Sequence, residues 1–214
     1  MATPTPDNAD FDQVFGAWQS ASTDFNDLVT PLSQQEWDTP TALPGWTVGD
    51  IVAHVGWLEG ILIGKFDDAH EPDWDALPHV TSDFGRLTEI PVDLRRSRTR
   101  EDVLIELAAN VADRREALDA GPHDVAVETP GPFGPAPLGR VLRMRTLDTW
   151  VHEQDIRDAL GRPGHLDARH SPKDRVHEAP RAPGSERHGF GDGSVRRDPA
   201  ERELVGTEPQ QGSR

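Results

Sequence analysis

The stretch Asp148-Thr149-Trp150-Val151-His152-Glu153-Gln154-Asp155-Ile156-Arg157 spaces a carboxylate, an imidazole and a second carboxylate four and three residues apart. Such positions share one face of a helix, so Asp148, His152 and Asp155 would project together. That face should be apolar, and buried charge is costly unless it is paired or bound to a metal. Far upstream, His54 lies on the apolar stripe of another predicted helix. We therefore predict a divalent metal ion held between two helices by His54, Asp148 and His152.

Apolar residues recur at spacings of three and four in four parts of the chain, which is typical of amphipathic helices. These segments cover about residues 8–30, 48–62, 99–119 and 137–160. Thr47 is a natural N-cap for the second helix, with Asp50 as its capping partner. No segment has a convincing strand pattern. The sequence therefore predicts an all-α fold, a four-helix bundle.

The segments between these helices are long. Residues 67–98 are rich in Pro, Asp and His without sustained periodicity, so we interpret them as a long loop with at most a short helical turn. Loops of this length often border functional sites. Ser33 and Glu36 form a capping-box pattern that predicts one short turn of helix. Residues 129–135 are rich in Pro and Gly and predict a rigid, irregular connection.

The chain changes character near its C-terminal end. Residues 1–165 contain the predicted metal-binding bundle, whereas residues 166–214 have few large apolar side chains and many Pro, Gly and Arg. Such a composition cannot offset the entropy of ordering the chain, so we predict a disordered or non-native tail and no folded second domain. The tail carries nine acidic and nine basic residues. The whole excess of negative charge therefore lies in residues 1–165.

Composition excludes several classes of function. The chain has no cysteine, which rules out disulfides, thiolate zinc sites and a cysteine nucleophile. Its net charge of −16 argues against nucleic-acid binding. We find no P-loop, no dinucleotide-binding glycine motif and no nucleophile elbow. Without a signal peptide or a membrane span, the sequence predicts a cytoplasmic protein, and it leaves the oligomeric state open.

Two imidazoles and one carboxylate suit zinc or a similar divalent ion, and three protein ligands leave a position open for water or substrate. Asp155, one turn further along, can fix the orientation of an imidazole or of an adjacent arginine, or it can instead form an ion pair with Arg157, Arg162 or a residue on another helix. An acid–His pair four residues apart also arises by chance. The alternative is a metal-free helical domain in which His54 and His152 are hydrogen-bonded core residues.

The other histidines are interpreted as ordinary surface residues, because they lie in predicted loops or in the tail. They are His70, His79, His123, His165, His170, His177 and His188.

Two motifs resemble those of a known family. TALPGWTVGDIVAHV (residues 41–55) is similar to the helix-entry motif of the mycothiol-dependent maleylpyruvate isomerase family, part of the DinB-like metal-binding superfamily. WVHEQDIRDALGRP (residues 150–163) looks like the second hallmark of that family. The motifs occur in the family's order and separation, and the resemblance covers about residues 8–166.

The resemblance implies a DinB-like four-helix bundle that binds a divalent metal, commonly zinc, on residues that map to His54, Asp148 and His152. Asp148 departs from the glutamate that is usual there. The implied function is that of a mycothiol-dependent thiol S-transferase or isomerase, in which the metal activates the thiol for attack on a small electrophilic substrate. The implied cofactors are therefore the metal and mycothiol. A non-catalytic metal-binding bundle is the alternative.

Many members also have a folded C-terminal domain that helps to form the substrate site, and the tail of this chain departs from that pattern. One hypothesis is that residues 166–214 are a frameshifted or truncated product. Sequencing the locus tests it, because an alternative reading frame encoding an apolar domain is then expected. A truncated protein of this kind could bind metal and still be inactive.

Overall fold

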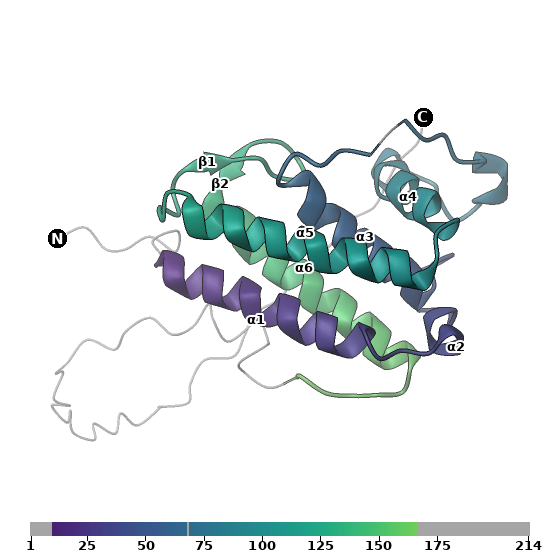
Figure 1. The fold of residues 1–214 in the computed structure, drawn as a ribbon. Helices are drawn as coiled ribbons and strands as arrows, with labels where there is room; N and C mark the ends of the chain where they lie inside the picture. Colours follow the sequence, from purple (N-terminus) through teal and green to yellow (C-terminus); the bar gives the residue numbers. More distant parts are fainter. Residues whose placement is uncertain (1–9, 68, 167–214) are drawn as a thin grey trace, which may run out of the picture. The chain divides into compact units, whose positions relative to one another are not determined.

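Four long helices form the body of the computed structural model, which describes residues 10–67 and 69–166 (Figure 1). They are α1 (Phe11–Val29), α3 (Val48–Ile61), α5 (Arg100–Ala120) and α6 (Leu138–Ala159). Helix α3 packs mainly against α5 and α1 mainly against α6, and α3 also contacts α6. The prediction of an all-α four-helix bundle is confirmed. Apart from Leu166, the predicted tail lies outside the described residues.

Side-chain caps set where the helices begin. At the start of α3, Thr47 accepts a hydrogen bond from the Asp50 backbone, and the Asp50 carboxylate accepts one from the Thr47 backbone at 2.8 Å. Ser33 and Glu36 make the same reciprocal box at the short helix α2 (Gln34–Trp37). Both boxes satisfy backbone groups that a helix end leaves unpaired, as the sequence predicted.

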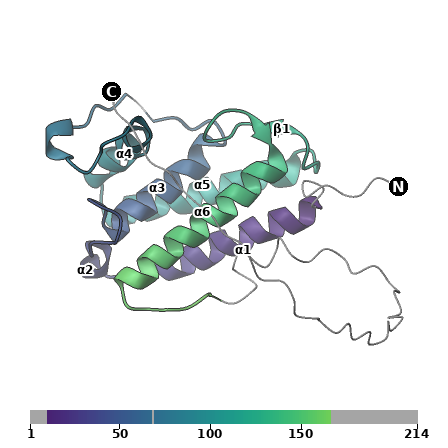
Figure 2. The ribbon, with the colours of Figure 1, turned by 180° about the vertical axis from the view of Figure 1, so that it is seen from behind.

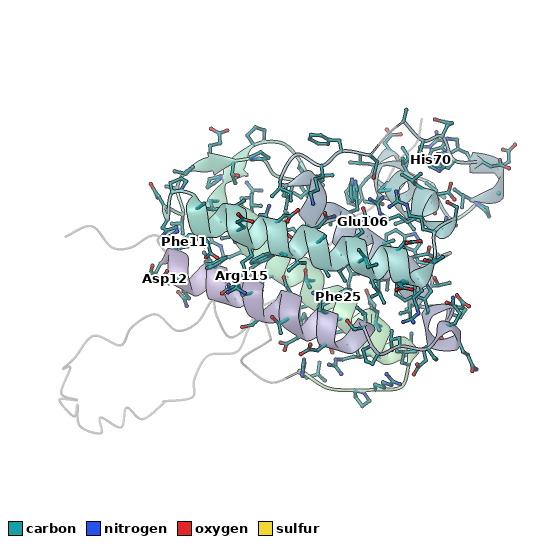
Figure 3. The ribbon with its side chains drawn as sticks, viewed as in Figure 1. Phe11, Asp12, Phe25, His70, Glu106 and Arg115 are labelled. Carbon is teal, nitrogen blue, oxygen red and sulfur yellow. The ribbon has the colours of Figure 1, made fainter. Side chains whose placement is uncertain are left out.

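Two clusters of buried apolar side chains fill the bundle. The larger lies between α1, α3, α5 and α6 and includes Phe25, which is fully buried and labelled in Figure 3. The smaller gathers around Trp18, also fully buried, with Phe11 and Leu142. Burial of this apolar area is the main force holding the helices together.

The prediction of a long loop at residues 67–98 is wrong for nearly half of that segment. It contains a short 3-10 turn (Trp74–Ala76) and the helix α4 (Asp83–Arg96), which packs against α3 (Figures 1 and 2). Two features explain why the sequence did not predict α4. Pro91 lies inside the helix, where proline normally breaks one, and the buried face of α4 includes Glu89 and Arg95, so it lacks an apolar stripe.

Ion pairs take the place of apolar packing around α4. The buried Arg95 binds Asp67 at 2.9 Å and Glu106 of α5. Arg96 pairs with Asp50 at the start of α3 (3.0 Å) and with Glu89 (2.7 Å). Buried charges are tolerated when they are paired in this way. Because its partners lie on α3 and α5, α4 is fixed against the bundle.

A small antiparallel pair of strands precedes α6. It consists of β1 (Glu128–Thr129) and β2 (Ala136–Pro137), with the predicted irregular connection between them. Both views place these strands at the end of the bundle opposite α2 (Figures 1 and 2). Among the described residues, no helix is both long and apolar enough to cross a lipid bilayer.

Candidate metal centre

His54 on α3 and Asp148 and His152 on α6 converge between the two helices. One potential ligand atom from each side chain lies within 4.8 Å of the others. The His54 Nε2 atom lies 4.0 Å from Asp148 Oδ2, and the His152 Nε2 atom lies 3.8 Å from Asp148 Oδ1. Both separations are too long for hydrogen bonds. The three residues thus face one another without bonding directly.

His54 is the most enclosed of the three. Its side chain is buried, and its Nδ1 atom has no hydrogen-bond partner among the described residues. Burial, with a further contribution from His152 and Arg145 against the opposing effect of Asp148, lowers the pKa of His54 to about 3. The imidazole is therefore neutral at pH 7 and keeps a lone pair. A metal ligand must be deprotonated in this way.

Asp148 is held by an arginine one turn earlier on α6. Arg145 Nη1 donates a hydrogen bond to Asp148 Oδ2 at 2.6 Å. Burial alone would raise the pKa of Asp148, but Arg145, His152 and His54 together outweigh it and lower that pKa below its ordinary value. Asp148 is therefore an ionised, oriented carboxylate, with its Oδ1 facing His152.

Asp155 contacts the imidazole of His152. The His152 Nδ1 atom lies 3.1 Å from Asp155 Oδ2, which leaves Nε2 turned toward Asp148. The alternative partners considered for Asp155 are engaged elsewhere: Arg157 binds Glu153 at 2.7 Å, and Arg162 pairs with Glu36. A carboxylate on the far nitrogen of an imidazole fixes its tautomer and orientation for metal binding.

The spacing of the three residues fits a divalent ion. Zinc binds nitrogen and oxygen at about 2.0–2.2 Å, so ligand atoms at tetrahedral angles lie roughly 3.4 Å apart. The separations of 3.8 and 4.0 Å, which involve different oxygens of Asp148, and the 4.8 Å that bounds one atom from each residue are wider than this, so the three side chains would draw together around an ion. A neutral imidazole with an unsatisfied buried nitrogen and an ionised carboxylate are suitable donors. The residues present therefore fit a metal ion with three protein ligands.

A buried polar network behind these residues was not predicted from the sequence. Glu59 of α3 is 1% exposed, and its Oε1 accepts hydrogen bonds from Arg145 Nε at 2.9 Å and from Trp18 Nε1 at 3.3 Å. Its Oε2 pairs with Arg114 Nε of α5 at 3.0 Å. Glu59 thus connects α1, α3, α5 and α6 and holds Arg145 against Asp148. The feature of the sequence that could have indicated this network is a glutamate, five residues after His54, in an otherwise apolar helix.

A second network joins α4 to the candidate centre through Trp46. The Trp46 ring lies 5.2 Å from that of His54 and 6.5 Å from that of His152. Its Nε1 donates to the buried Glu89 of α4 at 2.7 Å. His79 also contacts Glu89, at 3.3 Å. The segment that was predicted to be a loop, residues 67–98, therefore holds the Trp46 side chain in place beside both histidines.

The prediction that the remaining histidines are ordinary surface residues is wrong for three of them. His165 is half-buried, and its Nδ1 atom lies 2.8 Å from Oε1 of the buried Glu153. His70, labelled in Figure 3, is half-buried and lies 2.8 Å from Asp93 of α4. His79 is half-buried against Glu89. His123 is exposed and stacks on Phe11. His170, His177 and His188 lie outside the described residues.

A pocket opens beside the candidate centre. Its walls include His54, Trp57, Met144 and Asp148, and its rim includes Phe84 of α4 and Phe133 of the β1–β2 connection. A broader depression between α1 and α5 contains none of the three converging residues. The pocket beside His54 therefore gives a small molecule a route to His54 and Asp148.

Known proteins are similar to this chain in sequence. A family profile for the mycothiol maleylpyruvate isomerase N-terminal domain matches residues 18–157. Two uncharacterised proteins of Mycobacterium tuberculosis, Rv0036c of strain ATCC 25618 / H37Rv and MT0041 of strain CDC 1551 / Oshkosh, are each 26% identical over 161 residues. That alignment covers 75% of this chain and 59% of each relative. The chain thus spans less than two thirds of their length.

Solved structures share the fold. The crystal structure of the mycothiol-dependent maleylpyruvate isomerase aligns with a TM-score of 0.53 at 15% identity, covering 72% of this chain and 63% of that one. A mutant of that enzyme with one histidine replaced by alanine aligns equally well, at 14% identity. At this identity the likeness establishes the helical fold.

Proposed function

We propose a function for this chain from its family: it belongs to the mycothiol maleylpyruvate isomerase N-terminal domain family. In this proposal, His54, Asp148 and His152 bind a divalent metal ion, most suitably zinc, and the chain acts as a mycothiol-dependent enzyme. The reaction is either transfer of the thiol to a small electrophile or isomerisation through a thiol adduct. We also propose a cytoplasmic location and no nucleic-acid partner.

The observation that carries the proposal is the convergence of three potential ligand atoms within 4.8 Å, from helices nearly one hundred residues apart in sequence. The donor states support it further. His54 is buried and neutral, Asp148 is ionised beside Arg145, and His152 is oriented by Asp155. His54 and Asp148 are thus prepared to donate to a cation without first losing a proton, and the Nε2 atom of His152 is already turned toward Asp148.

The chain has no cysteine, so any reacting thiol must come from a cosubstrate. A bound divalent ion lowers the pKa of a thiol and so supplies thiolate at neutral pH. The three converging side chains would hold that ion. Trp46 and Trp57 would exclude water from it, because their rings lie beside the His54 ring, with centroids 5.2 and 6.2 Å away.

In a transfer, the sulfur forms a bond to the electrophilic carbon, the leaving group departs with its bonding electrons, and the thiol proton passes to solvent. In an isomerisation, the sulfur adds to a double bond and leaves again after rotation about the resulting single bond. Both reactions need the same thiolate, so the candidate centre supports either.

The experiment measures both mycothiol consumption, which reports transfer, and geometric isomerisation of the substrate, which leaves mycothiol unchanged, with a panel of small electrophiles before and after zinc is removed with a chelator. Turnover that disappears with zinc, returns on its addition and is absent in His54→Ala supports the proposal. Zinc binding without turnover across the panel would favour the alternative, a non-catalytic metal-binding bundle. Turnover that persists in the zinc-free protein would contradict the role given to the metal.

A further inference from the structure

Trp46 covers a part of the candidate centre that the pocket does not reach. The centroid of its ring lies 5.2 Å from that of His54 and 6.5 Å from that of His152. The pocket is lined by His54 and Asp148 of the centre, and neither Trp46 nor His152 lines it. The indole and the pocket therefore adjoin different parts of the same centre.

The indole is tied to a buried carboxylate. Trp46 Nε1 donates a hydrogen bond to Oε2 of Glu89 at 2.7 Å, and Glu89 is 1% exposed. Arg96 donates to the other oxygen of Glu89, also at 2.7 Å, and it binds Asp50 at the start of α3 at 3.0 Å. Hydrogen bonds to an ionised carboxylate are roughly twice as strong as those between neutral groups. The ion pair with Arg96 thus keeps Glu89 a strong acceptor for Trp46.

The backbone that carries Trp46 is held by the same cluster. Gly45 has a φ of +78°, in the left-handed region that favours glycine, and a Cβ atom there would lie 2.4 Å from the His79 ring. His79 occupies that space, and its Nε2 atom lies 3.3 Å from Oε2 of Glu89. Helix α4 and the segment before it therefore hold both the main chain beside Trp46 and the indole itself.

An aromatic wall at this place limits what a bound ion can hold. Three protein ligands leave zinc one position for water or substrate, and zinc can also expand to five ligands. A second water would need space beside the imidazoles, and Trp46 fills space beside both of them. The apolar surroundings of a metal also control how solvent reaches it. An indole that moved away would admit water and expose the ligands to exchange.

Resting on the proposed function, we propose that Trp46 shields the metal centre and that Glu89 is a positioning residue that acts through it. Glu89 keeps the indole against His54 and His152. A bound ion then keeps its three protein ligands and one exchangeable ligand, which enters from the pocket beside His54 and Asp148.

Zinc release from the full chain tests the shield without any thiol. Zinc-loaded protein is mixed with a chromogenic chelator, and the rate of zinc transfer is measured. Trp46→Ala should release zinc roughly 10- to 100-fold faster, because losing a residue that supports metal ligands usually weakens affinity by this factor. Trp46→Phe keeps a ring but lacks the Nε1 donor, so it should release zinc roughly three- to tenfold faster, the size of one hydrogen bond.

The same two substitutions at Trp74 are the matched controls. Trp74 also donates its Nε1 hydrogen to a carboxylate, that of Glu71 at 2.6 Å, and its ring packs on Arg86 of α4. Since Trp74 is not part of the candidate centre, Trp74→Ala and Trp74→Phe should release zinc at the wild-type rate.

Cobalt(II) bound in place of zinc reports the number of ligands, because its visible absorption is much weaker with five or six ligands than with four. The wild type and the Trp74 variants should give the intense spectrum of a four-ligand site. Trp46→Ala should give the weak spectrum, because water can then join the ion.

A double-mutant cycle tests whether Glu89 acts through Trp46. Zinc release from Glu89→Ala combined with Trp46→Phe should be no faster than from Glu89→Ala alone, because residues that act through one contact are not additive. Circular dichroism checks that Glu89→Ala keeps its helices. If it does not, Trp46→Phe decides, since it removes the same hydrogen bond and leaves the ion pair of Glu89 with Arg96 in place.

Equal release rates in Trp46→Phe and Trp74→Phe, or multiplied effects in the double variant, would overturn the role of Glu89. An unchanged cobalt spectrum in Trp46→Ala would overturn the shield. Turnover with mycothiol is then assayed on the same proteins. Wild-type turnover without any effect of Trp46 on zinc release would overturn this inference and leave the proposed function standing. Faster release from the Trp46 variants without turnover in any protein would support the shield while overturning the proposed function.

Discussion

Arg145 donates a 2.6 Å hydrogen bond to Asp148 from one turn earlier on α6, and its other side, Nε, is held by Glu59 of α3 at 2.9 Å. This relationship links the core of the bundle to the candidate metal centre. Asp148 has one oxygen bound by the arginine and the other facing His152. The carboxylate is therefore positioned by buried residues that do not contact the proposed metal.

Glu59→Ala should strongly destabilise the protein. The substitution leaves Arg114 and part of Arg145 buried without a counter-charge, and breaking a buried pair in this way costs about 3–5 kcal/mol. Urea unfolding of the two proteins measures the loss. Glu116→Ala is the control, because Glu116 is an exposed glutamate on α5, and its removal should change the free energy of unfolding by less than about 0.5 kcal/mol. Equal effects would contradict the role of the network.

Asp155→Ala should weaken zinc binding by about 10- to 100-fold, the usual effect of removing the group that orients a ligating imidazole. Competition with a chromogenic chelator measures the dissociation constant. Asp158→Ala removes an exposed aspartate from the same helix and should leave zinc affinity unchanged. If the two variants bind zinc equally well, Asp155 does not support His152 in the way that the 3.1 Å contact indicates.

The metal-free protein should lose stability on acidification below pH 6.5. His54 has an ordinary pKa near 6.5 in the unfolded chain and about 3 in the folded one, so between these values the unfolded state binds more protons. Stability then rises with pH across that window, by up to about 1.4 kcal/mol per pH unit. Urea unfolding between pH 7 and pH 5 lies above the range of most carboxylates, and comparison with a variant that lacks His54 separates its contribution from that of the other histidines.

His54→Gln is the comparison for the pH series, because it removes the titrating group and keeps a polar side chain of similar length. The wild type should lose about 1–2 kcal/mol more than this variant between pH 7 and pH 5. Parallel pH profiles would show that His54 is not held neutral by burial.

Much of the fold follows from local sequence rules. The apolar spacing of the four long helices and the capping boxes at Ser33 and Thr47 depend on neighbours within one or two turns, so they can be read directly. Helix α4 could not be predicted in this way. Its buried face is stabilised by pairs such as Arg95 with Asp67 and Glu106, and these partners become visible only once the chain is folded.

The candidate centre likewise contains residues that local spacing predicts and residues that it does not. Asp148, His152 and Asp155 share a helix face at regular spacing, so their proximity could be predicted. Glu59 and Arg145 are 86 residues apart, and neither belongs to a recognisable pattern. Trp46 is likewise linked to Glu89 across 43 residues. The residues that position the centre are held by long-range contacts, which one sequence does not specify.

Gly49→Ala should destabilise the junction of α2 and α3. A Cβ atom at Gly49 would lie 2.1 Å from Trp37 Nε1, and overpacking of this kind costs about 1–3 kcal/mol. Gly16→Ala is the matched control, since nothing lies within 4 Å of a Cβ there. In a helix interior that change should stabilise by about 0.5–1 kcal/mol. Thermal unfolding should therefore move in opposite directions for the two variants.

Metal content tests the central claim most directly. After dialysis against zinc and removal of the excess, elemental analysis should find one zinc ion per chain in the wild type and in His123→Ala, which removes an exposed histidine away from the centre. His54→Ala and His152→Ala, if they retain the helical circular-dichroism spectrum, should bind little or none. A wild-type protein without stoichiometric zinc, or both variants retaining it, would contradict the assignment of His54, Asp148 and His152 as a metal site.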